Sequence, residues 1–180
     1  MLKERKLKMN FEFSNIRQKE RKVKYSTSEM KHSHILQILC LLLFYIVWVI
    51  DSFFLKASTF LENYVPLPIR LAISLSIIAA GSFLIARAHQ QLFKDKPADL
   101  ITTGIFAHVR HPMYLGIILT YLGWIIATFS LLTFIPWILA VTLYVKMANH
   151  EEKQLEERFG EKYEEYKRKV PKWIPKLKTE

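Results

Sequence analysis

Long apolar segments constrain the fold of this chain more than any other feature of its sequence. They cover residues 35–55, 66–88 and 113–147. A helix needs about 20 predominantly apolar residues to cross a bilayer, so each of the first two segments predicts one membrane span. The third segment has room only for a tight helical hairpin that is short or kinked at Pro136. The predicted fold class is therefore an all-α integral membrane protein with about four transmembrane helices, the last two forming a hairpin.

Basic residues gather at the two ends of the chain. Ten of the 26 Lys and Arg residues lie in residues 1–31, and nine lie in residues 149–180. By the positive-inside rule, both termini and the loop 89–112 are expected in the cytoplasm. We expect residues 1–31 to form a flexible, solvated tail, with contact to anionic lipid as the alternative. The membrane domain is placed at 32–148, and no nucleic-acid partner is expected.

The C-terminal segment, residues 151–170, is predicted to be one amphipathic helix. Its apolar residues recur at steps of three and four, and Pro171 and Pro175 end the pattern. We expect this helix to lie on the bilayer surface or on the cytoplasmic loops. The residues on its apolar face are Leu155, Phe159, Tyr163, Tyr166 and Val170.

Polar residues with chemical potential occur at two predicted junctions between membrane and cytoplasm. The first is Arg110-His111, with Tyr114 one turn further on. The second comprises Lys146, His150, Glu151 and Glu152, where the last span leaves the bilayer. A hairpin would bring the two junctions together and would set a cationic pair against a carboxylate pair. That arrangement suits a ligand with an α-amino and an α-carboxylate group, although all these charges could also be ordinary interfacial residues.

The glycines and histidines exclude other kinds of site. The five glycines form neither GxGxxG nor a P-loop, so a Rossmann or P-loop nucleotide site is excluded on pattern. His108 and His111 lie three residues apart but have no third ligand nearby, so no metal site is expected. The absence of a side chain at Gly116 is interpreted as room for a closely approaching ligand.

Two segments in this order, "GIFAHVRHPMYLG" and "EEKQLEERFGEKYEEYKRKVPKWIP", resemble the isoprenylcysteine carboxyl methyltransferase and phospholipid methyltransferase superfamily. The resemblance covers about residues 66–175. It implies S-adenosylmethionine as the cofactor, bound at the cytoplasmic end of the last helices and enclosed by the C-terminal segment 149–180. It assigns catalytic roles to Arg110 and Glu152. The residues that it implies for cofactor binding are Leu100, Gly104, Ile105, Phe106, Arg110, His111, Pro112, Tyr114, Gly116, Glu151 and Glu152.

The resemblance implies methyl transfer to a lipophilic acceptor that enters from the bilayer, such as an isoprenylcysteine carboxylate or a phospholipid amine. Phe106 stands where many relatives have tyrosine, and the loop before it lacks a tryptophan that is common in the prenylcysteine branch. Two alternatives remain open. One is a membrane reductase of the sterol-reductase type, and the other is a non-catalytic adaptor or transport subunit in which Asp51 would be an ion or proton site.

Overall fold

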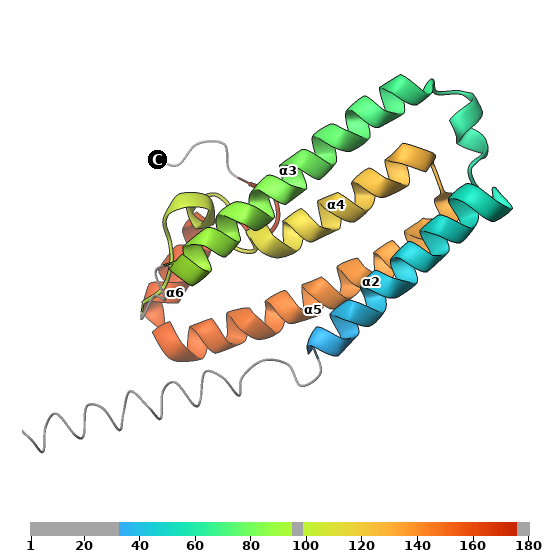
Figure 1. Ribbon diagram of the computed structural model, residues 1–180. Helices are drawn as coiled ribbons and strands as arrows, with labels where there is room; N and C mark the ends of the chain where they lie inside the picture. The colour runs from blue at the N-terminus through green and yellow to red at the C-terminus, as the bar shows by residue number, and fades with distance from the viewer. Residues whose placement is uncertain (1–32, 95–98, 176–180) are drawn as a thin grey trace, which may run out of the picture. The chain divides into compact units, whose positions relative to one another are not determined.

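A computed structural model describes residues 33–94 and 99–175 of the chain (Figure 1). The chain divides into two units, Met1–Ser33 and His34–Glu180. The helices described below belong to the second unit, apart from the first residue of α2. The predictions made for the tail 1–31 lie outside the described residues.

Within the described residues of the second unit, all regular secondary structure is helical, in agreement with the predicted fold class. Short turns of 3₁₀-helix lie in the connections, at Phe60–Asn63 (η2), Gly104–Ala107 (η3) and Leu131–Thr133 (η4). The longer helices are α2 (Ser33–Val49, continued by the π-helical turn η1, Ile50–Leu55), α3 (Leu67–Lys94), α4 (Pro112–Thr128), α5 (Phe134–Phe159) and α6 (Glu161–Lys169).

Among the described residues, three helical segments are long and apolar enough to cross a membrane. They are Ser33–Leu55, Leu67–Leu92 and Leu131–Phe159. The predicted hairpin is present as α4 and α5, and α4 is its short member. With 17 residues, α4 is about 25 Å long, at the lower limit for a span. Pro136 does not kink α5, because it lies in the first turn, where no backbone N–H is needed.

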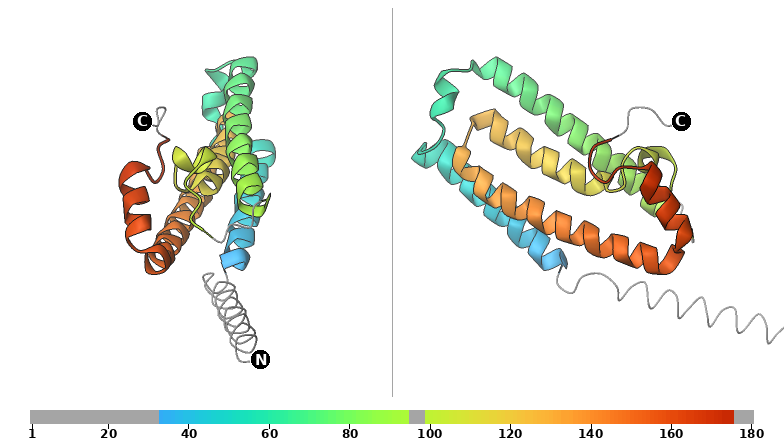
Figure 2. Two further views of the ribbon diagram at one scale, coloured as in Figure 1. Left: turned by 90° about the vertical axis from the view of Figure 1, so that its left-hand side faces the viewer. Right: turned by 180° about the vertical axis from the view of Figure 1, so that it is seen from behind.

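Helices α3 and α4 lie side by side along most of their length (Figures 1 and 2). Glycine on both helices permits this approach, since a Cβ on Gly81 would lie 2.6 Å from the Gly116 carbonyl oxygen. A Cβ on Gly116 would lie 2.5 Å from the Gly81 carbonyl oxygen. Nearer the other end of α4, a Cβ on Gly123 would lie 2.5 Å from Cγ1 of the Ile78 side chain of α3. The space beside Gly116 is thus filled by α3, which corrects the interpretation of that glycine as room for a ligand.

Asp51 ties the far end of α2 to the turn between α4 and α5. Its carboxylate is fully buried and accepts hydrogen bonds from the backbone N–H groups of Ala57 and Ser58, at 3.1 and 3.2 Å. The hydroxyls of Ser58 and Ser130 donate to its other oxygen. Asp51 is therefore neither an exposed boundary charge nor a carboxylate open to an ion, because donors of the surrounding loops surround both oxygens.

The predicted amphipathic helix 151–170 is divided in two. Helix α5 continues without interruption from the membrane span to Phe159, and Gly160 then turns the chain into α6. Gly160 has φ 52° and ψ −127°, a conformation open essentially to glycine alone. The apolar period continues across this turn, which is why the sequence pattern concealed it. The turn folds α6 back beside the connection between α3 and α4 (Figure 2).

Candidate functional site

The backbone that leads into the site is held by a side chain of α3. The Gln91 amide oxygen accepts a hydrogen bond from the Ile105 N–H at 3.0 Å, and its amide nitrogen donates to the Thr103 carbonyl at 3.3 Å. Gly104 lies between them with φ +60°, and a Cβ there would lie 2.0 Å from Gln91 Nε2. Only glycine therefore lets the chain pass this close to Gln91 and enter the turn Gly104–Ala107.

The segment Arg110-His111-Pro112 starts α4. Pro112 occupies the beginning of the helix, where its fixed φ is favourable and its missing N–H costs nothing. His111 precedes it, is buried, and accepts the Leu115 N–H with its own carbonyl at 3.0 Å. The Arg110 N–H donates a hydrogen bond at 3.0 Å to the carbonyl of Pro171, in the segment that follows α6. These contacts aim both side chains of the Arg-His pair at α5.

A buried cluster of charges forms where α4 and α5 meet. Glu152 of α5 is 7% exposed, and its Oε1 lies 2.9 Å from His111 Nε2 and 3.0 Å from Arg110 Nη1. Its Oε2 lies 3.0 Å from Lys172 Nζ. One carboxylate is thus contacted by three basic side chains. Such a contact set holds Glu152 in place and offsets much of its loss of hydration.

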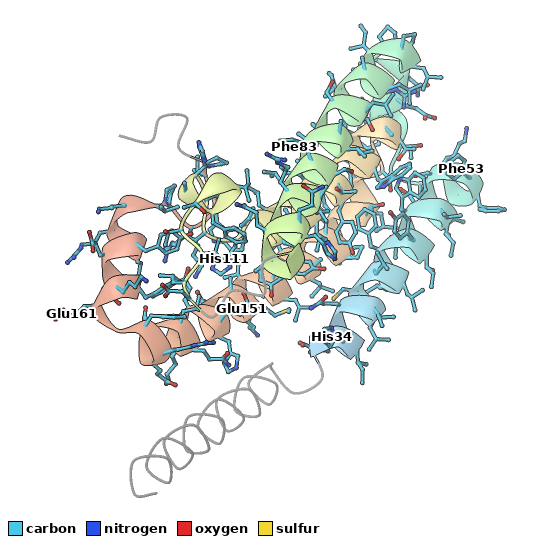
Figure 3. All side chains as sticks on the ribbon, turned by 60° about the vertical axis from the view of Figure 1, so that its left-hand side comes forward. His34, Phe53, Phe83, His111, Glu151 and Glu161 are labelled. Carbon is cyan, nitrogen blue, oxygen red and sulfur yellow. The ribbon has the colours of Figure 1, made fainter. Side chains whose placement is uncertain are left out.

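Glu151 lies at the rim of this cluster, with 46% of its side chain exposed. The Tyr114 hydroxyl donates to its Oε1, and its Oε2 lies 3.7 Å from His111 Nδ1. His111 therefore faces one glutamate with each ring nitrogen, while its ring stacks on Tyr114 at a centroid distance of 5.8 Å. Figure 3 shows His111 and Glu151 beside each other at the junction of α4 and α5.

Two tyrosines of α6 are buried next to the site. Tyr163 and Tyr166 are buried together with Val170, and Leu100 packs against them. The Tyr166 hydroxyl donates to the Phe106 carbonyl at 2.7 Å, so that α6 is pinned to the turn that precedes Arg110. Burial raises the pKa of the Tyr163 hydroxyl to about 12, and the nearby Glu152 adds to this effect. Tyr163 is therefore a neutral group at physiological pH.

Some of the predicted site residues lie together in the structure, and others lie around them. Arg110, His111, Tyr114, Glu151 and Glu152 come together at one junction, as the predicted hairpin required. The other residues frame it: Leu100 and Phe106 contact α6, Gly104 and Ile105 contact Gln91, Pro112 starts α4, and Gly116 packs on α3. Two members of the second junction point elsewhere, since Lys146 is exposed and His150 contacts Gln154 on its own helix.

Sequence reasoning missed Lys172, Trp173, Tyr163 and Gln91. Lys172 and Trp173 follow Pro171, which was interpreted only as the end of a helix. The Trp173 ring lies 5.8 Å from the His111 ring, so this short segment belongs to the site. A tryptophan between two prolines in an otherwise charged tail was the available signal. Within residues 33–94 and 99–175, no group of three His, Cys, Asp or Glu side chains could hold a metal ion.

The fold is that of a multi-pass helical membrane protein, and a cluster of charged side chains lies where α4 meets α5. The sequence profile of the family "Phospholipid methyltransferase" matches residues 69–162, which is more than half of the chain. The chain belongs to this family, and the resemblance drawn from the two motifs is confirmed.

Curated relatives of this chain differ in the activity for which they are named. A Protein-S-isoprenylcysteine O-methyltransferase of Schizosaccharomyces pombe is 37% identical over 87 residues, which are 46% of this chain and 35% of that protein. A Methanethiol S-methyltransferase of Crocosphaera subtropica is 38% identical over 87 residues, 46% of this chain and 33% of that protein. A Delta(14)-sterol reductase of Mus musculus is 24% identical over 147 residues, 70% of this chain and 35% of that protein. The matches span only about a third of these relatives' length. No solved structure matches the chain.

Proposed function

We propose that this protein transfers a methyl group from S-adenosylmethionine to a lipophilic acceptor in the membrane. The observation that carries the proposal is the meeting of Arg110, His111 and Glu152 beside Glu151 and Tyr114. Two sequence motifs that are far apart in the chain supply these groups, and all five residues lie within residues 69–162, which match the phospholipid methyltransferase family.

The groups of this site fit the amino-acid end of the cofactor. Arg110 can donate to a carboxylate, and the half-exposed Glu151 can accept from an ammonium group. Arg110 Nε is buried and makes no hydrogen bond to the described part of the chain. The Tyr163 hydroxyl lies beside this guanidinium, also buried and without an aligned partner among the described residues. Buried polar atoms of this kind are costly unless a ligand completes them.

The cofactor supplies a methyl group that is already activated by its positive sulfur. The protein therefore has to align the acceptor, exclude water and, for some acceptors, remove a proton. Arg110 and Glu152 are proposed to hold the cofactor and so to fix the direction of transfer. A carboxylate acceptor needs no base, whereas an amine or thiol would give up its proton to Glu151 or to His111 at the rim.

The acceptor is proposed to be lipophilic and to reach the site from the bilayer. Relatives of this chain are named for methyl transfer to an isoprenylcysteine group and to methanethiol. The chemistry of the site is compatible with a carboxylate, an amine or a thiol as acceptor. Both termini and the site are proposed to face the cytoplasm, because basic residues gather on that side. Labelling of a cysteine placed in the loop 56–66 by an impermeant reagent in intact cells checks this orientation.

The experiment is calorimetric titration of the detergent-purified protein with S-adenosylhomocysteine, in parallel with Glu152→Gln. We expect the wild type to bind and Glu152→Gln to lose binding, because Arg110 and Lys172 lose the carboxylate that holds both side chains in position. Glu165→Gln, an exposed glutamate that pairs with Lys169, is the matched control and should bind normally. Glu151→Gln leaves no buried Lys or Arg without its carboxylate, so this variant is expected to fold. It therefore tests the site even if Glu152→Gln unfolds. A folded wild type without affinity would refute the cofactor assignment.

The second candidate function is reduction, which the similarity to a Delta(14)-sterol reductase favours. That match covers more of this chain than the methyltransferase matches do, at lower identity. The same calorimetric experiment with a reduced nicotinamide dinucleotide separates the two functions. Binding of the dinucleotide with no binding of S-adenosylhomocysteine would favour the reductase.

A further inference from the structure

Lys172 lies near the end of the second motif and was not among the predicted site residues, yet it contacts the most buried carboxylate of the site. We propose that Lys172 is a positioning residue that makes the site selective for ligands with a carboxylate group. This inference rests on the proposed function, and it adds a residue and a ligand preference to it.

Two contacts hold the Lys172 ammonium group in the site. Its Nζ lies 3.0 Å from Glu152 Oε2 and also donates to the Asn149 side-chain oxygen one helical turn away. Only 19% of the Lys172 side chain is exposed. Both partners belong to α5, so the lysine clamps the C-terminal segment onto the helix that carries Glu152.

The chain that carries Lys172 is anchored on either side of it. Before it, Val170 is buried against the tyrosines of α6, and the Pro171 carbonyl accepts the Arg110 N–H at 3.0 Å. After it, the Trp173 ring lies 5.8 Å from the His111 ring. The backbone is thus fixed to the Arg-His segment at the level of Glu152. The lysine is placed by its surroundings and does not reach Glu152 from a free tail.

The charges of the cluster do not cancel. Arg110 and Lys172 are two permanent cations, and both contact the single carboxylate of Glu152. His111 adds a third donor or cation and no negative charge. Glu151 faces the other nitrogen of His111, but 46% of its side chain is exposed and its charge is largely screened by water. A buried cluster with more cations than anions is completed by an anion, here the carboxylate of the bound ligand.

Lys172 contributes to this preference in two ways. It occupies Oε2 of Glu152, so that the glutamate cannot rotate away from Arg110 and His111. It also adds a second permanent positive charge. Because the single negative charge of Glu152 balances only that of Arg110, the charge of Lys172 is left without a buried counter-charge. Without Lys172, one carboxylate would face one permanent cation, and the electrostatic reason for recruiting a second carboxylate would be lost.

The test compares two probes by calorimetry. One is S-adenosylhomocysteine, and the other is its decarboxylated analogue, which keeps the adenosine, the sulfur and the amine. The variants are Lys172→Met, Lys172→Gln and Lys172→Arg. Lys169→Met is the control, because Lys169 is an exposed lysine of α6 that pairs with Glu165 four residues earlier. Lys172→Gln retains a donor for Glu152, so at least one neutral variant should remain folded.

We expect Lys172→Met and Lys172→Gln to bind S-adenosylhomocysteine about tenfold more weakly, the usual scale for one charge-assisted contact. Their affinity for the decarboxylated analogue should stay the same or rise, whereas Lys172→Arg should recover most of the wild-type preference. An equal loss for both probes would show a merely structural role and overturn the inference, as would unchanged affinity for both. If the folded wild type binds neither probe, the proposed function itself fails.

Discussion

At the scale of the residue, a few positions determine whether the site can form. Gly104 is an example, since its φ of +60° disfavours any side chain and a Cβ there would displace the Gln91 amide that holds the turn. The sequence showed the glycine within a motif but could not show its reason. That reason is a side chain of α3, which lies 13 residues earlier in the chain and meets Gly104 only after folding.

Gly104→Ala is expected to lower the stability of the protein and its affinity for S-adenosylhomocysteine together. A Cβ would collide with the Gln91 amide, and a non-glycine residue at this φ costs about 1–2 kcal/mol by itself. Adding Gln91→Ala should relieve the collision and recover part of the loss, leaving only the backbone cost. Thermal unfolding in detergent and calorimetry measure both effects. A double variant as weak as the sum of the single variants would contradict the proposed contact.

At the scale of the element, the contact between α3 and α4 depends on small residues. The hydrophobic effect does not drive helices together in lipid, so their association depends on close packing. Gly81 opposite Gly116 allows the two backbones to approach. The small residues Ala79, Ala80, Gly81 and Ser82 of the second span favour such a close approach. The sequence did not reveal that Gly116, within the RHPMYLG motif, serves the same interface.

Gly116→Val is expected to lower the thermal stability markedly, because its Cβ would lie 2.5 Å from backbone that cannot move aside easily. Ala79→Val is the control, since Ala79 lies on the exposed side of α3 and should tolerate the added methyl groups. Unfolding temperatures of the two variants in the same detergent provide the measurement. Equal stability of both variants would show that α3 and α4 are not in this contact.

At the scale of the whole molecule, the two ends of the helices carry different groups of polar residues. One end holds the charged site, and the other is closed by Asp51 together with the loop after α2 and the turn before α5. The length of α4, about 25 Å, separates them. The adaptor hypothesis depended on Asp51 as an ion site, and its hydrogen bonds to loop groups favour a structural role.

Asp51→Asn is therefore expected to separate stability from binding. The amide cannot accept from all the donors that surround the carboxylate, so the thermal stability should fall, by roughly 1–3 kcal/mol in free energy. The affinity of the folded variant for S-adenosylhomocysteine should equal that of the wild type. A selective loss of ligand affinity at unchanged stability would mean that Asp51 communicates with the site.

The sequence by itself determined the helical membrane fold, the hairpin and the meeting of the Arg-His pair with Glu151 and Glu152. Apolar length, charge at the segment ends and helical period are local properties, and a short connection leaves two helices little choice but to be neighbours. Only the tertiary structure decided that Gly160 breaks the last helix, that Gly116 faces α3, and that Lys172 contacts Glu152. The contacts of Gly116 and Lys172 join residues far apart in the chain, so no local pattern contains them. The break at Gly160 is local, but the apolar period continues across it and concealed it.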